Sequence, residues 1–283
     1  MKLKNLTKLW NRFWFKEHPV DGICLFRILI GAVAISIFLQ DLVFHHDLWA
    51  PSGLQSIESF RKFFSGRRYN LFHLLEGNLA SLKIILFLHA IAQVSFICGY
   101  KTRLPAIVLM ITMTSLAQRN IQVQNGADLL LRILLLIICF APCGNRFSID
   151  SFLAAKRGTP LRKEWAPWAH RLVQIQVAFV YLSIVYEKYK GVNWLAGMAI
   201  YYATRLEDFS RYSVPYILDN IIILKLLTWG TLLLELALGS LIFFDEFRKK
   251  LIISGILFHI SIDYVMPIPT FGILMTACLL AMF

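Results

Sequence analysis

The sequence predicts an all-α membrane protein, a polytopic bundle of about eight transmembrane helices with both termini in the cytoplasm. Hydrophobic residues make up 58% of the 283 residues, and charged residues only 16%. Soluble domains contain about 45–50% apolar and about 25% charged residues. The apolar residues also gather in long runs separated by short polar connections, which is typical of membrane-spanning helices.

The distribution of positive charge predicts the orientation of the helices. The net charge is +12, and Lys and Arg concentrate in the connections between apolar runs. If the N-terminus is cytoplasmic, the inner segments carry fifteen of these residues and the outer connections carry eight. Short loops rich in Lys and Arg stay in the cytoplasm, which favours N-in and C-in. The charge therefore reflects membrane topology, and we expect no nucleic-acid partner.

The chain divides into a short surface segment and one transmembrane domain. In residues 1–20, basic residues are mixed with Trp and Phe, which indicates a basic amphipathic segment lying on anionic membrane lipid. Residues 21–283 form the transmembrane helical domain. Its spans are expected at about 23–43, 82–98, 105–117, 127–141, 168–187, 221–244, 251–265 and 271–283.

Charges at the end of the fifth span mark a candidate site, because charged groups are expensive to bury in a membrane. Glu187 and Lys188 end this span, directly before the turn at Gly191 and the aromatic residue Trp194. A lysine beside an apolar wall loses its proton more easily than one in water, so Lys188 can serve as a base or an amine nucleophile. In the alternative interpretation, Lys188 and Trp194 only anchor the helix at the interface.

Under this topology, further polar residues lie at the non-cytoplasmic ends of spans. His259 and Asp263 are one helical turn apart, so the carboxylate can orient the imidazole ring, although both can also be structural. Arg132 and Glu235 lie at intermediate depth and are expected to form a structural ion pair. The candidate site comprises Lys188 and His259 as catalytic residues, Asn125, Asp128 and Trp194 as binding residues, and Glu187, Asp263, Lys225, Glu235 and Arg132 as supporting residues.

Other common catalytic and metal-binding patterns are absent from the sequence. There is no Gly-rich phosphate loop, Ser-His-Asp arrangement or zinc motif. The five cysteines form neither a redox CxxC motif nor a disulfide framework. The adjacent pair His45 and His46 lacks a defined second pair of ligands, so we predict no metal.

Several short motifs occur in a particular order between residues 20 and 280. They are Phe26-Arg-Ile-Leu-Ile-Gly31, Gly99-Tyr-Lys-Thr-Arg103, Asn125-Gly-Ala-Asp128, Phe140-Ala-Pro142, Tyr181 through Glu187-Lys188, Trp194-Leu-Ala-Gly197, Glu235 and Phe258-His259. In this order they resemble the HTTM domain, the membrane domain shared by vitamin K-dependent γ-carboxylase and many bacterial proteins. The Glu-Lys and Trp-x-x-Gly portion is the most specific part of the resemblance.

The resemblance implies a carboxylase-like, quinol-oxygenating enzyme in a bacterial inner or plasma membrane. Its cofactor would be a reduced quinone, menaquinol or a vitamin K-like quinol, and its substrate a peptide. In the carboxylase, a lysine at the position of Lys188 is taken as the base that starts oxygenation of vitamin K hydroquinone. His259 stands where the family has a histidine after a phenylalanine, and we expect Asn125 and Asp128 to bind the polar head of a substrate.

Two departures from the carboxylase keep a second function open. This chain reads Gln124-Asn-Gly-Ala-Asp128 where the carboxylase has Asn-Asn-His, and the large soluble domain that grips the propeptide has no counterpart in these residues. The alternative is a non-catalytic or partner-dependent maturation factor for a secreted peptide, similar to the sporulation-delay toxin maturation protein. Such a factor would work with a small soluble protein, and an oligomer is also left open. A transporter ranks last, because no repeated pair of broken helices is present.

Overall fold

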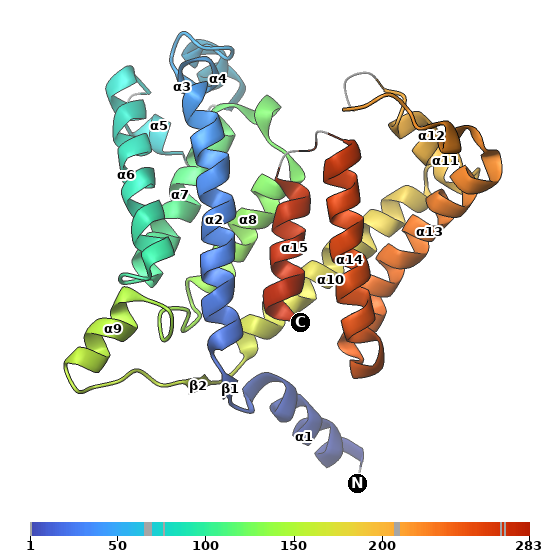
Figure 1. The fold of residues 1–283 in the computed structure, drawn as a ribbon. Helices are drawn as coiled ribbons and strands as arrows, with labels where there is room; N and C mark the ends of the chain where they lie inside the picture. Colours follow the sequence, from blue (N-terminus) through green and yellow to red (C-terminus); the bar gives the residue numbers. More distant parts are fainter. Residues whose placement is uncertain (1, 65–69, 76, 207–209, 267, 269) are drawn as a thin grey trace. The chain divides into compact units, whose positions relative to one another are not determined.

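A computed structural model describes residues 2–64, 70–75, 77–206, 210–266, 268 and 270–283. The described residues are mostly helical, and the one small sheet has two strands. They fall into two compact units, Met1–Arg171 and Leu172–Phe283. Figure 1 shows the order of the helices along the chain, from blue at the N-terminus to red at the C-terminus.

A helix forms at the place of each of the eight expected spans. These helices are α2 (Asp21–Val43), α6 (Leu79–Cys98), α7 (Arg103–Arg119), α8 (Gly126–Ile138), α10 (Trp168–Tyr189), α13 (Ile221–Ser240), α14 (Asp245–Val265) and α15 (Phe271–Met282). Within the described ranges, four helices are long and apolar enough to cross a membrane: α2, α6, α10, and α13 continued through the 3-10 turn η4 (Leu241–Phe243). The helical membrane class is thus confirmed, whereas eight crossings and their orientation stay predictions.

The N-terminal segment forms the amphipathic helix α1 (Lys2–Phe15), followed by strand β1 (His18–Pro19). Strand β1 pairs antiparallel with β2 (Glu164–Trp165), with His18 opposite Trp165. The apolar side chains Leu6, Leu9 and Trp10 of α1 are all more than half exposed. Contact of this helix with lipid stays a prediction, and residue 1 of the expected segment lies outside the described residues.

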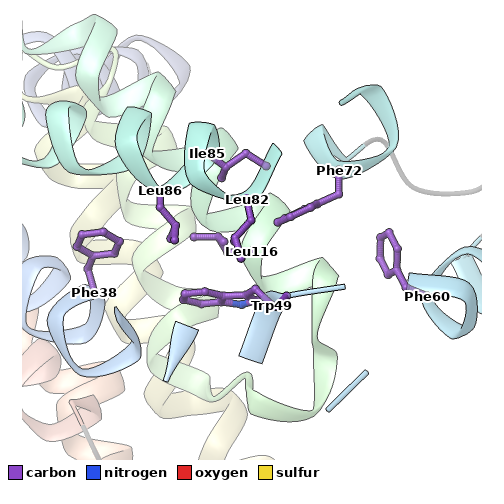
Figure 2. Packing of buried hydrophobic residues seen from close by; sticks show 9 residues of the cluster. Phe38, Trp49, Phe60, Phe72, Leu82, Ile85, Leu86 and Leu116 are labelled. Carbon is purple, nitrogen blue, oxygen red and sulfur yellow. The ribbon is translucent and has the colours of Figure 1, made fainter. Parts of the chain in front are cut away.

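Between α2 and α6, the described residues include three short helices. They are α3 (His45–Trp49), α4 (Ile57–Phe64) and α5 (Leu71–Leu74). One large aromatic side chain in or beside each helix is buried, namely Trp49, Phe60 and Phe72. Figure 2 shows these rings in one cluster with side chains of α2, α6 and α7. The many polar residues between α2 and α6 gave no indication in the sequence that these aromatic side chains would be buried.

Two fully buried arginines cross-link the first unit. Arg27 on α2 donates to the carbonyl oxygens of Cys143 and Phe147, in the turn that leads from α8 to α9 (Ile149–Lys156). Arg119, at the end of α7 and before the 3-10 turn η1 (Ile121–Val123), donates to the carbonyls of Ala50 and Gln55. Since a buried guanidinium and a buried carbonyl both need partners, each arginine fixes a loop to a helix.

The second unit contains the rest of α10 and the three C-terminal helices. Between α10 and α13 lie α11 (Val192–Leu195), α12 (Ala199–Ala203) and the 3-10 turn η3 (Tyr216–Asp219). Helix α14 packs against α13 and α15, and Gly255 lets Leu238 and Leu279 approach its backbone closely. Small residues at such crossings are the usual means of packing membrane helices.

Gly99 follows α6 and allows Ser148 and Arg27 of the first unit to approach its backbone closely. Its φ of 73° is left-handed, and a Cβ there would collide with Ser148 and lie 2.8 Å from the guanidinium of Arg27. Gly158 has the same conformation, with a φ of 75°, but nothing lies within 4 Å of its Cβ position. Gly158 is therefore a matched control, since both glycines carry the same backbone constraint.

We expect Gly158→Ala to lower the free energy of unfolding by about 1–2 kcal/mol, the cost of the left-handed conformation. Gly99→Ala should lower it by a further ~1–3 kcal/mol, because the methyl group overpacks the contact with Ser148. Thermal unfolding of the two purified variants in one detergent measures the difference. Equal losses in the two variants would contradict the packing described for Gly99.

Candidate functional site

The centre of the second unit is an ion pair between Lys188 and Glu235. Lys188 lies in the last turn of α10, and its Nζ donates to both carboxylate oxygens of Glu235 on α13, at 2.7 and 2.8 Å. The side chain of Glu235 is 5% exposed and that of Lys188 is 20% exposed. The ring of Trp194 lies 4.3 Å from Nζ, a cation–π distance. The ammonium is therefore held between a carboxylate and an indole ring.

Each residue of the expected ion pair between Arg132 and Glu235 has a different partner within its own unit. Both oxygens of Glu235 accept from Lys188. Arg132 instead donates from Nε to the carbonyl of Asp128, and from its Nη2 to the side chain of Gln124 at 2.9 Å. The single ammonium group of Lys188 can donate to both oxygens of the Glu235 carboxylate, because it carries several N–H donors.

A second polar pair lies on the same helices and holds His259. Tyr181 precedes Lys188 by seven residues, two turns of α10, so both residues lie on one face of the helix. Its hydroxyl lies 2.8 Å from Nε2 of His259, and both side chains are buried. Asp263 was expected to orient this ring, but Tyr181 does so. If the phenol donates to Nε2, Nδ1 is the protonated nitrogen; in either tautomer this buried Nδ1 has no partner among the described residues.

Asp263 offers the complementary unpaired atom. The backbone amide of Gly272 hydrogen-bonds its carboxylate, and any side chain at Gly272 would collide with the two oxygens. The carboxylate is thus fixed against the first turn of α15. Its Oδ1 is buried and has no partner in the described part of the chain. Asp263 follows His259 by one turn of α14, so the two residues present an unpaired donor and an unpaired acceptor on one helix face.

The segment that carries Trp194 is fixed on α13. Any side chain at Gly197 would meet the aliphatic stem of Lys225, whose Cγ lies 2.7 Å from the Cβ position, and the ring of Trp229. Trp229 in turn donates from Nε1 to the carbonyl of Leu195 at 3.3 Å. Lys225 therefore contributes packing, and it forms no ion pair with any described residue. These contacts place the indole of Trp194 beside the ammonium of Lys188.

Glu187 belongs to the surface and not to the buried pair. Its carboxylate accepts from Lys190 at 2.8 Å, and both side chains are at least half exposed. The ammonium of Lys190 lies 4.0 Å from the ring centre of Tyr186. Lys190 and Lys188, two residues apart, therefore point to different environments, which makes Lys190 a control position for Lys188.

Asn125 and Asp128 belong to the first unit, where they form a capping box at the start of α8. Asn125 accepts from the backbone amides of Ala127 and Asp128, and Asp128 accepts from the amide of Asn125 at 3.0 Å. Such a reciprocal cap satisfies amides that the helix itself leaves unpaired. That Asn125 and Asp128 share one site with Lys188 stays a prediction.

Asp128 also lines a pocket of about 50 Å³ in the first unit. Asp41 and His89 line it as well, and the sequence interpretation did not include either in the site. The sequence could have identified Asp41 and His89, because both are polar residues within apolar runs. Tyr181 was also missed as a site residue, although its spacing of seven residues from Lys188 places it on the same helix face. The polar lining of the pocket comprises Asp41, Trp49, His89, Gln124, Asp128 and Arg132.

Comparisons with known proteins identify relatives of this chain and its family. The uncharacterized protein YitO of Bacillus subtilis (strain 168) is 23% identical over 289 residues, which cover 98% of this chain and 90% of YitO. The sporulation-delaying protein SdpB of the same bacterium is 29% identical over 116 residues, covering 38% of this chain and 35% of SdpB. No solved structure matches significantly. The family model described as the HTTM domain matches residues 15–283, and the chain therefore belongs to the HTTM domain family.

Proposed function

We propose that this membrane protein is an enzyme with a lysine-centred site at the non-cytoplasmic face, acting on a reduced quinone-like cofactor and a peptide substrate. One observation carries the proposal: the buried pair of Lys188 and Glu235 lies beside Trp194, in a unit that also holds the unpaired Nδ1 of His259. Buried charges within membrane helices are costly and are usually retained for function. Membership of the HTTM family supports the same assignment.

Lys188 can act as a base only after it loses a proton, and Glu235 is the acceptor in contact with it. Burial of an ion pair costs several kcal/mol per ion, which the mutual attraction only partly offsets. Transfer of one proton from Nζ to a carboxylate oxygen of Glu235 leaves both groups uncharged and keeps their hydrogen bond. The freed lone pair on Nζ can then accept a proton from a ligand, with Glu235 holding the first proton.

The unpaired atoms of His259 and Asp263 fit the hydroxyl group of a reduced quinone. A hydroxyl donates one hydrogen bond and accepts others, which matches an acceptor Oδ1 and a donor Nδ1–H one helical turn apart. These two residues would hold and orient the hydroxyl, and Trp194 would present an aromatic face. When bound, a reduced quinone supplies the reducing electrons that protein side chains lack.

We further propose that all eight helices cross a bacterial plasma membrane and that both termini are cytoplasmic. The helices α7, α8 and α15 are shorter than a full span, but they pack against longer helices within their own units. The excess of Lys and Arg in the inner connections supports this orientation.

Reporter fusions at Asn120 and Gly158 test the topology. Asn120 follows α7 and Gly158 lies between α9 and β2, so two helices separate the two positions: the expected span α8 and the eight-residue helix α9. We expect a periplasm-active reporter to be active at Asn120 and a cytoplasm-active reporter to be active at Gly158. The same side for both positions would contradict the eight-span topology, because α8 would then not cross.

Retention of a quinone by the purified protein tests the proposed cofactor. Mass spectrometry of lipids extracted from protein in mild detergent should find quinone with the wild type and with Lys190→Ala. Lys188→Ala should lose the quinone or retain it chemically unaltered, because the base and the cation beside Trp194 are gone. An empty wild type, or equal retention and turnover in Lys188→Ala, would contradict the proposal.

A double variant separates this effect from a loss of folding. Lys188→Ala leaves the buried carboxylate of Glu235 without its partner, which costs about 3–5 kcal/mol. Lys188→Met combined with Glu235→Leu removes both charges and should recover most of that stability. The double variant should remain folded and still lack the function, whereas a functional double variant would sink the role of Lys188.

One observation favours a second function, a maturation factor for a secreted peptide. Part of the chain is similar to a protein named for delaying sporulation. A factor of this kind would act with a small soluble partner protein and need no quinone. Co-purification of such a partner with both the wild type and Lys188→Ala would favour this function over the enzyme, and a solitary functional protein would exclude it.

A further inference from the structure

The pocket of the first unit lies where four elements bring polar groups together. Asp41 comes from the last turn of α2, Trp49 from the end of α3, His89 from the middle of α6, and Asp128 and Arg132 from the first turns of α8. Asp41 is half-buried, and its carboxylate has no hydrogen bond or ion pair within the described ranges. A half-buried carboxylate is unfavourable unless a hydrogen-bond donor or a cation lies beside it.

His89 adds a second unused acceptor to the pocket. The side chain is 3% exposed, and its Nδ1 lies 2.9 Å from the hydroxyl of Thr112. That hydroxyl has one hydrogen and lies 2.8 Å from the carbonyl of Val108 and 3.1 Å from that of Leu109; when it donates to either carbonyl, it accepts from Nδ1–H of the ring. In that arrangement the other nitrogen, Nε2, carries a lone pair, and it has no partner in the part of the chain that the structure describes.

The pocket also holds unused donors. Trp49 is buried, and its Nε1–H has no partner among the described residues. Arg132 donates from Nε and Nη2 within the protein, which leaves the hydrogens of Nη1 available. The polar lining thus combines two carboxylates, those of Asp41 and Asp128, the amide of Gln124 and an imidazole with an indole donor and a guanidinium. Both charge signs are present, so the complementary ligand is a zwitterion that carries N–H donors.

Size and surroundings narrow the class of ligand. A volume of about 50 Å³ holds three or four groups the size of a water molecule, since one needs roughly 10–15 Å³. This is the size of an ethanolammonium arm and too small for three additional methyl groups, so most of the phosphate of such a headgroup would lie outside this volume, with one oxygen reaching in. The remaining walls are apolar, with Ile37, Phe38 and Leu116 among them. No group of three or more described His, Cys, Asp or Glu side chains is arranged to hold a metal ion.

We propose that this pocket binds the phosphoethanolamine headgroup of a membrane phospholipid, with the ammonium at Asp41 and Nε2 of His89 and a phosphate oxygen at Trp49 and Arg132. Ammonium and phosphate then each meet the opposite charge and a neutral hydrogen-bonding partner. Choline headgroups are excluded twice, because they lack N–H donors and are larger. The assignment uses none of the atoms of Lys188, Glu235 or His259 and is independent of the proposed enzyme function.

Native mass spectrometry with an equimolar mixture of phosphatidylethanolamine and phosphatidylcholine of the same acyl chains tests the assignment. The wild type should bind the ethanolamine lipid at least about tenfold better, a difference of about 1.4 kcal/mol. Asp41→Asn keeps the shape of the side chain and should reduce the preference to less than about twofold, because a neutral amide attracts the ammonium far less. Asp47→Asn, at an exposed carboxylate on α3, should leave the preference unchanged.

Three further arms decide among the outcomes. Trp49→Phe keeps the ring, removes the N–H donor, and should weaken binding of the ethanolamine lipid more than fivefold. Glycerophosphoethanolamine, the headgroup without acyl chains, should not displace the lipid at equal concentration; tighter binding of this soluble compound would overturn the lipid assignment. Lys188→Ala should retain the full preference. Equal binding of the two lipids by the wild type, or an undiminished preference in a folded Asp41→Asn variant, would overturn the proposal.

Discussion

The hydrogen-bonded ion pair of Lys188 and Glu235 is the constraint on which the second unit depends. Neither charge is stable in an apolar helix bundle without the other, so α10 and α13 must meet at this level. Tyr181 and His259 extend the polar interior from α10 to α14, and Asp263 extends it to α15. Helices α10, α13 and α14 therefore each contribute a polar side chain whose position another helix fixes. Because this pair is costly to bury and can exchange a proton, it is suited to converting the ammonium of Lys188 into a neutral amine.

Polar groups in the first unit serve two purposes that the contacts distinguish. Arg27 and Arg119 are surrounded by backbone carbonyls and hold loops in place. Asp41, His89 and Trp49 line a pocket and retain unused hydrogen-bonding atoms. Arg27 and Arg119 also have nitrogens without a partner among the described residues, so the pocket, and not a missing partner alone, separates the candidate binding residues from the structural ones.

Long apolar runs allowed the eight helices to be predicted from the sequence, because periodicity and length are local properties. The position of Lys188 before a turn also marked this residue as a candidate for a site. The partner of Glu235 was not predictable in this way, because any cation at similar depth fits the pattern, and the choice of Lys188 over Arg132 depends on which helices pack. His259 shows the same limit, since its neighbour in sequence, Asp263, is not its partner, and Tyr181 on another helix is.

Infrared difference spectroscopy of the carboxyl group of Glu235 tests most directly whether this pair stores a proton. The spectrum of the purified protein would be recorded before and after addition of a reduced quinone, with Glu235→Gln identifying the band. We expect the carboxylate band of Glu235 to be replaced by that of a protonated carboxylic acid when the ligand binds. A Glu235 that stays ionised with the ligand bound would contradict the account, because Lys188 would then have passed it no proton.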